Sequence, residues 1–264
     1  EAFRYFIYGR NEFRKWNYPA AWNWLYQAIS VDSNFTDAIT MLSLSYRNEF
    51  ESEKMIKSYG DETLYDKAKE FCLKAYEKRD QMPPQEKINT NWIYAGYFET
   101  PNEEIKYLKQ LLDFDDMDPI AYFNLGNSYF NLYQYDKAIP EFEKALGIYK
   151  KWGLKPYWIF NYTYLGECYR ETGQYKKAKK IYKLAEKDFP DDPTLILDQA
   201  ILSEAVGDTI AAKRYIEKGN SFAKSVSMSD ASVATILALA YTEVERIDKA
   251  EKYYRQAFSL EPES

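Results

Sequence analysis

The chain of 264 residues contains no histidine, and this absence removes several classes of chemistry. Catalytic pairs in which His activates a Ser or Cys nucleophile are excluded, and so are metal sites built on imidazole. Catalysis by Lys or by carboxylates is left open, but no pattern of residues points to it. We therefore expect no enzyme activity, no catalytic residue, no cofactor and no metal site in this chain.

Glycine and cysteine are also scarce. The ten glycines form no Gly-x-Gly sequence, which loops that cradle a dinucleotide or a phosphate need. The two cysteines, Cys72 and Cys168, lie 96 positions apart (168 − 72) and fall in different repeats of the pattern described below. Cys72 occupies a packing position in that pattern, so we expect a buried thiol rather than a disulfide or a reactive centre.

Long apolar runs are missing as well. The longest, from Ala231 to Tyr241, is interrupted by Ser232 and Thr235. It is shorter than the ~20 residues that span a bilayer, and no signal peptide is visible. The formal net charge of −6 argues against a nucleic-acid backbone as partner. We expect no membrane segment in this chain and no nucleic acid bound through it. A cytoplasmic location is favoured, with the periplasm as the alternative if a membrane helix lies upstream.

The sequence does contain one spacing that recurs four times in its second half. A small residue is followed by Ala twelve positions later, by an aromatic residue or Ile four after that, and by a small residue three further on. The copies are Gly126, Ala138, Phe142 and Ala145; Gly166, Ala178, Tyr182 and Ala185; Ala200, Ala212, Ile216 and Gly219; and Ala238, Ala250, Tyr254 and Ala257. Their first residues are 40, 34 and 38 positions apart (126, 166, 200, 238). A period near ~34 with this signature predicts helix-turn-helix repeats that stack on one another.

The spacing has a physical explanation. Two helices of a hairpin approach closely where both side chains are small, as at Gly126 and Ala138. Tyr122 and Tyr129 lie four residues before and three after Gly126, so they share its face. Each hairpin has more apolar surface than it can bury alone, and we expect the next hairpin to cover it. An irregular helical bundle with chance Ala spacing is the alternative, but four copies agree at four positions.

The pattern continues toward the N-terminus with departures. A first copy is intact, a second has a step of twenty-five in place of twelve, and a third has Trp92 where a small residue is expected. Their residues are Gly9, Ala21, Leu25 and Ala28; Leu42, Ser43 and Tyr46 with Ala68, Cys72 and Ala75; and Trp92, Leu108 and Leu111. The second copy therefore carries an insertion of thirteen residues (25 − 12).

The repeats predict an all-α fold of seven hairpins and fourteen helices, in a single solenoid over residues 1–264. The expected repeats cover approximately residues 2–35, 36–84, 85–118, 119–158, 159–192, 193–230 and 231–264. Helix starts are predicted by Asp-Pro pairs and a capping box, and turns by glycines. The pairs are Asp118-Pro119 and Asp192-Pro193, the box is Thr100 to Glu103, and the turns are at Gly60-Asp61, Gly173 and Gly207. If Asp136 caps its helix, Pro140 becomes the fourth helical residue and removes one backbone hydrogen bond.

Two charged clusters have alternative interpretations. The acidic one consists of Asp113, Asp115, Asp116 and Asp118. An EF-hand counted from Asp113 would place Met117 and Asn124 at ligand positions, so a turn with a capping Asp is favoured over a calcium site. The basic one consists of Lys176, Lys177, Lys179 and Lys180 on a predicted second helix. A solvated face is favoured there, with a phosphate or anionic-lipid patch as the alternative.

The stretch from Pro119 to Pro262 resembles the tetratricopeptide repeats. Residues 121–146 match the family pattern at Tyr122, Leu125, Gly126, Tyr129, Ala138, Phe142 and Ala145, and residues 162–190 match as well and add the closing Pro190. The resemblance implies a right-handed superhelical solenoid of antiparallel helix pairs that binds a protein or peptide. It also implies that one face of each first helix lines the concave side where peptides lie.

The candidates on that face are rotated about 100° from the packing residues. They are Phe123, Asn127, Phe130, Ile93, Tyr97, Thr163, Glu167 and Arg170. The Phe rings give rigid apolar area, Asn127 can bond a peptide backbone at two atoms, and Arg170 can pair with a carboxylate. The alternative is that the aromatic side chains only fill the inner curve of the superhelix.

Residues 1–46 are similar to the opening of repeat regions in bacterial signalling proteins, where such regions follow a nucleotide cyclase, kinase or DNA-binding domain. The similarity rests on Glu1-Ala2-Phe3, Gly9-Arg10, Ala28-Ile29, Asp32, Phe35, Ala38 and Tyr46, with Ser33 in place of the usual Pro. The chain also starts inside a repeat and without Met, so we expect it to be part of a longer protein.

Three function classes remain open. The first is a protein- or peptide-binding scaffold that forms the sensory or regulatory region of a bacterial signalling protein. The second is self-association as a homodimer. It is suggested by Tyr253 and Phe258 near the edge of the last copy, which ends at Ser264 without a polar capping helix. The third is a carbohydrate-binding or catalytic protein that uses aromatic platforms.

Overall fold

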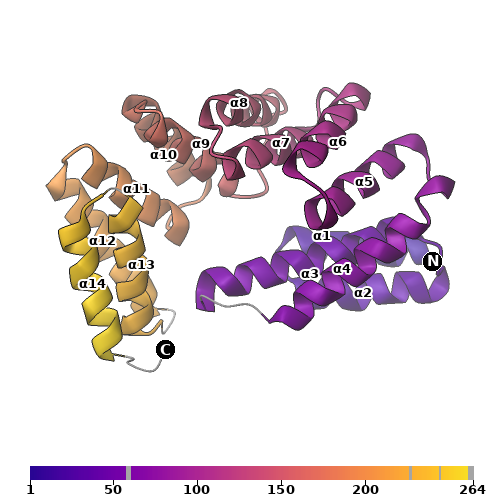
Figure 1. Cartoon of the computed structure of the whole chain (residues 1–264), viewed down its shortest axis with the longest axis horizontal. Coiled ribbons are helices and arrows are strands. Elements are labelled where there is room, and N and C mark those ends of the chain that lie inside the picture. The colour runs from indigo at the N-terminus through magenta and orange to yellow at the C-terminus, as the bar shows by residue number, and fades with distance from the viewer. Residues whose placement is uncertain (58–60, 226–227, 244, 261–264) are drawn as a thin grey trace. The chain divides into compact units, whose positions relative to one another are not determined.

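The structure is a computed structural model that describes residues 1–57, 61–225, 228–243 and 245–260. These residues form fourteen α-helices and one short 3-10 helix, and no strand occurs among them (Figure 1). The predicted fold class and helix number are therefore confirmed. The chain divides into two compact units, residues 1–128 and 129–264, and each is described by itself.

The first unit contains three complete hairpins and most of a seventh helix. The helices are α1 (Ala2–Arg14), α2 (Tyr18–Val31), α3 (Thr36–Lys57), α4 (Glu62–Glu77), η1 (Arg79–Gln81), α5 (Pro84–Phe98), α6 (Pro101–Phe114) and α7 (Pro119–Asn131), whose last residues belong to the second unit. Within the hairpins α1 packs on α2, α3 on α4 and α5 on α6. The first helices α1, α3 and α5 also touch in succession, which is how stacked hairpins bury their apolar faces.

The second unit repeats this arrangement. Its helices are α8 (Tyr135–Lys151), α9 (Phe160–Glu171), α10 (Tyr175–Asp188), α11 (Pro193–Ala205), α12 (Thr209–Ser225), α13 (Asp230–Glu243) and α14 (Ile247–Leu260). The pairs α9–α10, α11–α12 and α13–α14 are hairpins, and the first helices α9, α11 and α13 touch in succession. Each unit thus stacks its own hairpins, and one solenoid over the whole chain stays a prediction.

The four-residue spacing predicted buried packing positions. At the third position this is confirmed in four copies, whereas Ile216 is half-buried and Tyr254 in the last copy is 42% exposed, so the prediction is wrong there. Leu25, Leu108, Phe142 and Tyr182 stand sixteen residues after the first position of their copies, and all four are fully buried. In the first unit a continuous core joins helices α1 to α4. It contains Phe6, Ala21, Leu25, Ala28, Ala38, Ile39, Leu42, Tyr46, Ala68, Phe71 and Ala75.

The irregular second hairpin accommodates its insertion by lengthening its first helix. Helix α3 has 22 residues, against 13 in α1. The predicted pairing across the hairpin is confirmed, because the buried Ser43 hydroxyl donates to the Ala68 carbonyl at 2.7 Å. The turn predicted at Gly60-Asp61 is only partly within the described residues: Gly60 lies outside them, and Asp61 caps α4 by accepting from the Thr63 amide at 2.9 Å.

The predicted helix starts are also confirmed. The Asp118 carboxylate accepts from the amides of Ile120 and Ala121 at 2.8 and 3.2 Å. Asp192 accepts in the same way from the first turn of α11, at 2.9 and 3.2 Å. In the capping box Thr100 Oγ1 accepts from the Glu103 amide at 3.4 Å. Such bonds satisfy amides that have no partner inside the helix.

The acidic cluster takes the role of a turn. Asp115 accepts from the Met117 amide at 2.9 Å, and Asp118 caps α7 as described. Burial raises the pKa of Asp118, because the carboxylate loses water when it is enclosed, and its bonds to backbone amides oppose that rise. The capping interpretation favoured over calcium is therefore the one supported by these contacts.

The position of Pro140 differs from the conditional prediction. The N-cap of α8 is Gln134 and not Asp136, so Pro140 is the sixth helical residue rather than the fourth. Asp136 lies in the first turn of α8, where a negative charge interacts favourably with the helix N-terminus. Helix α8 continues through Pro140 to Lys151, held by its buried face.

Five hairpin turns contain a residue in the left-handed conformation, each seven positions after the small residue of its copy. They are Trp16 (φ 63°), Tyr133 (φ 57°), Gly173 (φ 71°), Gly207 (φ 75°) and Glu245 (φ 56°). Gly173 and Gly207 confirm the predicted turns. At the other three positions the sequence offers no glycine, although this conformation costs a residue with a side chain about 1–2 kcal/mol.

Both cysteines are buried and unpaired. Burial raises the pKa of the Cys72 thiol to about 12, and that of Cys168 to about 12 as well. At neutral pH neither forms the reactive thiolate, so the prediction of a buried thiol at Cys72 is confirmed.

Candidate functional site

The eight predicted groove residues divide between the two units. Four lie in the first unit and four in the second: Ile93, Tyr97, Phe123 and Asn127, then Phe130, Thr163, Glu167 and Arg170. A common groove over all eight residues stays a prediction. Their local surroundings can be compared within each unit.

Four of the eight side chains are largely enclosed, and one of them, Arg170, is charged. Ile93 and Thr163 each expose 2% of their surface, and Phe123 is also buried. Side chains enclosed to this degree offer little area to a partner and contribute mainly to packing. Asn127, Phe130, Tyr97 and Glu167 are half-buried, so these four retain accessible surface.

Two of the accessible residues lie one turn apart on α7. Phe130 stacks almost parallel on Tyr164 of α9, with ring centroids 4.9 Å apart, and meets the edge of Tyr135 at 5.8 Å. Asn127 is half-buried, and its side chain forms no hydrogen bond within the described residues. Its amide therefore retains both donors and its acceptor for a partner, beside a rigid aromatic surface.

Arg170 is already engaged. Its side chain is buried and pairs with Glu171 at 2.8 Å and with Glu167 at 3.8 Å. A carboxylate from a partner would have to compete with both glutamates for the guanidinium. Arg170 can therefore bind a carboxylate of a partner protein only if that carboxylate replaces Glu167 or Glu171.

Tyr97 is held against the second hairpin. Its hydroxyl lies 3.3 Å from Ser43 Oγ, and the Arg47 guanidinium lies 5.4 Å from its ring centroid. Burial raises the pKa of Tyr97, while Arg47 opposes that rise. The side chain is thus positioned by α3 and keeps its proton at neutral pH.

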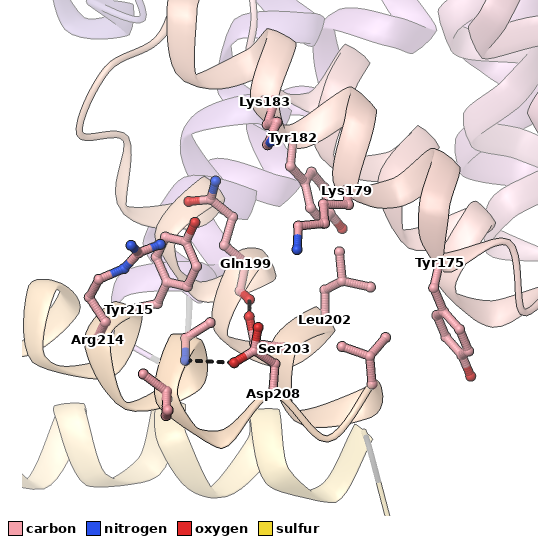
Figure 2. A pocket seen from close by; sticks show the side chains of 13 residues that line it. Tyr175, Lys179, Tyr182, Lys183, Gln199, Leu202, Ser203, Asp208, Arg214 and Tyr215 are labelled. Atoms are coloured by element: carbon pink, nitrogen blue, oxygen red, sulfur yellow. Dashed lines mark hydrogen bonds between the residues drawn. The ribbon is translucent and has the colours of Figure 1, made fainter.

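A cavity of about 340 Å³ lies in the second unit, among α10, α11, α12 and the turn between the last two (Figure 2). Its lining residues are Tyr175, Lys179, Tyr182, Lys183, Gln199, Leu202, Ser203, Val206, Asp208, Ile210, Ala211, Arg214 and Tyr215. The volume is at the lower end of that of ligand pockets, which is about 300–1,000 Å³.

The cavity contains three cations and one carboxylate. Lys179 and Lys183 enter from α10, and Arg214 enters from α12 (Figure 2). None of the three pairs with a carboxylate among the described residues. The Asp208 carboxylate is engaged at the start of α12, where it accepts from the Ala211 amide at 3.0 Å. The lining therefore carries a formal charge of +2 (three cations less one carboxylate).

The floor of the cavity is fixed by α11. Ser203 and Gln199 are buried there, and the Ser203 hydroxyl donates to the Gln199 carbonyl at 2.7 Å. Leu202 lies beside them and is also buried. Val206, Ile210 and Tyr175 form an exposed apolar rim. The cavity thus combines unpaired positive charge with apolar walls.

Sequence reasoning did not predict this cavity. It assigned binding to the first helices, whereas Lys179, Lys183 and Arg214 come from second helices. The basic run on α10 was the available signal, since Lys179 and Lys183 lie four residues apart on one face. All four of these lysines are exposed, and Lys176 and Lys180 do not line the cavity.

A second, more open hollow of about 410 Å³ lies on α13 and α14. It is lined by Thr242, Ile247, Ala250, Glu251, Tyr254 and Arg255. Its surface is mainly apolar, and Ile247 and Tyr254 are exposed.

Across the described part of the chain, no helix is both long enough and apolar enough to cross a membrane.

Family models for the tetratricopeptide repeat match residues 118–189 and 231–264. These two stretches of the chain are tetratricopeptide repeats. Tetratricopeptide-repeat proteins generally act as protein-interaction scaffolds and are generally not catalytic. No curated protein matches the sequence.

Solved tetratricopeptide-repeat structures share the fold. A Rap protein complexed with competence and sporulation factor has a TM-score of 0.64 and 16% identity, over 99% of this chain and 75% of that one. PilF of Pseudomonas aeruginosa has a TM-score of 0.55 and 17% identity, over 87% and 93%. A tetratricopeptide repeat protein from Parabacteroides merdae has a TM-score of 0.52 and 16% identity, over 98% and 93%. At these identities the likeness extends to the fold alone.

Proposed function

We propose that this tetratricopeptide-repeat chain binds an extended segment of a partner protein along the first helices of its hairpins, with α7 as the principal contact. The observation that carries the proposal is the pair formed by Asn127 and Phe130. The Asn127 amide, which has no hydrogen-bond partner in the part of the chain that the structure describes, lies one helical turn from a ring that is stacked flat on Tyr164.

The chemistry of this pair suits a peptide backbone. An Asn amide can donate to a carbonyl and accept from an N–H of the same extended segment, which fixes the direction of the segment. The Phe130–Tyr164 stack offers rigid apolar area, and rigid aromatic side chains lose little entropy on binding. Tyr97 and Glu167 are further accessible candidates within their own units.

Affinity capture with the 264-residue chain as bait tests the proposal. We expect partners held by the wild type to be lost by Asn127→Ala and by Phe130→Ala. Matched controls are Asn131→Ala, at the exposed end of the same helix, and Tyr133→Ala, in the turn that follows. The controls should capture what the wild type captures. Identical capture by all five proteins would sink the assignment to α7, provided that melting curves show each to be folded.

The proposal also includes a biological setting. We place the chain in the sensory or regulatory region of a larger bacterial signalling protein, because residues 1–46 are similar to the opening of such regions. The complete gene product decides this point. A nucleotide cyclase, kinase or DNA-binding domain in the same polypeptide is the expected finding, and a gene product without any of them contradicts the setting.

Self-association is the second candidate function. It is favoured by exposed apolar side chains on α13 and α14, where Ile247 and Phe258 expose 62% and 66% of their surface. A second copy could cover them. Sedimentation at two concentrations should then show mass rising with concentration, and Phe258→Asp should abolish the rise. A monomer at both concentrations removes this candidate.

A further inference from the structure

The cavity among α10, α11 and α12 lies on a different set of helices from the α7 face, and its charge is opposite to that of the chain. The chain carries a formal net charge of −6, whereas the cavity lining carries three cations and one carboxylate. The carboxylate of Asp208 is occupied by the Ala211 amide. Among the described residues, no carboxylate pairs with Lys179, Lys183 or Arg214.

The three cations are solvent-exposed side chains that line one cavity. Lys179 and Lys183 lie four residues apart on α10, where like charges repel. Arg214 approaches from α12 and lies 4.8 Å from the centroid of the Tyr215 ring, which orients its guanidinium beside the cavity. An oxyanion placed between the two helices would interact favourably with all three cations, and a guanidinium binds a carboxylate with two parallel hydrogen bonds.

We propose that this cavity binds an acidic segment of a partner protein, in which one Glu or Asp side chain enters the cavity and neighbouring apolar side chains cover its rim. The apolar rim favours a protein segment over a small free anion. Val206, Ile210 and Tyr175 are exposed around the opening, and a phosphate ion would leave them in water. A volume of about 340 Å³ accommodates a few side chains rather than a folded domain.

The proposal relies on the scaffold function of the family and is independent of the α7 face. A partner could occupy either site alone, or one partner could occupy both. The two sites are separable by experiment, since no residue is shared between them.

The test is fluorescence anisotropy with the full chain and a fluorescein-labelled peptide of sequence Leu-Glu-Glu-Leu-Phe-Glu-Glu-Leu. The same peptide with Gln in place of every Glu serves as the ligand control. We expect the acidic peptide to bind and the Gln peptide to bind at least tenfold more weakly. Equal binding of the two peptides, or no binding of the acidic one, overturns the proposal.

The matched protein variants separate the cavity from general electrostatic attraction. Lys179→Gln combined with Arg214→Gln should weaken the acidic peptide about tenfold or more. Lys176→Gln combined with Lys180→Gln removes the same charge from α10 at positions that do not line the cavity, and should leave affinity within about twofold. Equal loss in the two double variants shows attraction without a site and contradicts the proposal.

Two further variants cover the remaining outcomes. Ile210→Asp places a negative charge on the rim at a residue with 84% of its surface exposed, so the fold should survive while the acidic peptide binds more weakly. Phe130→Ala should leave the acidic peptide unaffected, and a loss there would assign the peptide to α7 instead. Heparin binding is measured as well. If heparin binds, its binding requires Lys179 and Arg214, and the acidic peptide does not bind, then the cavity is a polyanion site and the proposal is overturned.

Discussion

Hairpin α5–α6 in the first unit and hairpin α9–α10 in the second solve the same packing problem in opposite ways. In α9–α10 the small residue is Gly166, and a Cβ atom added there would lie 2.0 Å from Cε1 of the buried Tyr182. The helix backbone and the ring are therefore in direct contact. In α5–α6 the corresponding residue is Trp92, which fills the space that close approach would remove.

The partner position changes together with Trp92. Twelve residues later the regular repeats have Ala, whereas here Glu104 accepts a hydrogen bond from Trp92 Nε1 at 3.2 Å. Burial raises the pKa of Glu104, and Arg47 and the Trp92 donor oppose that rise. The two hairpins show two ways to pack a pair of helices. In one a glycine allows close approach, and in the other two large side chains form a hydrogen bond across the gap. The first solution depends on close contact between backbone and ring, and the second depends on a hydrogen bond between two large side chains.

The largest effect is expected at the aromatic position of the regular repeats. Phe142 is fully buried, so Phe142→Ala should lower the free energy of unfolding by ~3–5 kcal/mol through lost burial and the cavity that remains. Urea unfolding measures the change. Phe130→Ala, at a half-buried ring, serves as the comparison and should cost less. Equal costs would contradict the distinction between a packing residue and a surface residue.

The next prediction tests the close contact at Gly166. Gly166→Ala should destabilise the chain by ~1–3 kcal/mol, because the new methyl group meets the Tyr182 ring. The matched control is Gly147→Ala, inside α8, where a Cβ meets nothing within 4 Å. That change should stabilise by about 0.5–1 kcal/mol, since Ala favours a helix. A stabilised Gly166→Ala variant would show that the two helices can separate without cost.

The pH dependence of Glu104 tests the other hairpin. Its folded pKa is raised, so the folded state binds the proton more tightly than the unfolded state. The stability that the protonated group contributes is present below the unfolded pKa, about 4.3, and is lost as the pH rises through the folded pKa. Within that window the slope is at most about 1.4 kcal/mol per pH unit.

Glu104→Gln removes this dependence while its amide oxygen can still accept from Trp92. The variant should therefore gain stability relative to the wild type between pH 4 and pH 7. Unfolding curves at both pH values measure the difference, with Glu103→Gln as the control at a carboxylate on the same helix whose side chain is 41% exposed and pairs with Lys106. If the difference in unfolding free energy between Glu104→Gln and the wild type is the same at both pH values, then burial does not raise the pKa of Glu104.

The smallest effect is expected at the turns. Tyr133 has a positive φ and is 79% exposed, so Tyr133→Gly should stabilise by about 1 kcal/mol through relief of backbone strain. Gly173→Ala, at the equivalent turn, should destabilise by about the same amount. Thermal melts of the two variants should thus shift in opposite directions. Shifts in the same direction would exclude backbone strain as the cause.

The sequence predicted the fold well because the same residue types recur at the same packing positions in several repeats. Positions such as Ala138 and Tyr182 must be small or flat for the helices to fit, and this requirement is visible as residue type. Trp92 was visible as a departure, but its compensation by Glu104 was not, because a hydrogen bond between two unusual residues has no period. The turns at Trp16 and Tyr133 were missed for a similar reason, since their backbone conformation is imposed by the flanking helices.

The sites were less predictable than the fold. Face assignments placed Asn127 and Phe130 on accessible surface but also selected Ile93 and Thr163, which are enclosed. Periodicity gives the direction of a side chain and does not give the depth of its surroundings. The cavity with Lys179 and Arg214 forms where two hairpins pack together. No spacing within a single sequence shows that residues of different hairpins line the same cavity.

The left-handed turn residue has a consequence for how the chain can diversify. Glycine occupies that position in two hairpins, and Trp16, Tyr133 and Glu245 occupy it in three others with the same backbone conformation. The connection therefore tolerates an indole, a phenol or a carboxylate without reshaping the helices on either side. Selection can exchange the chemistry displayed at these bends one residue at a time while the scaffold stays the same.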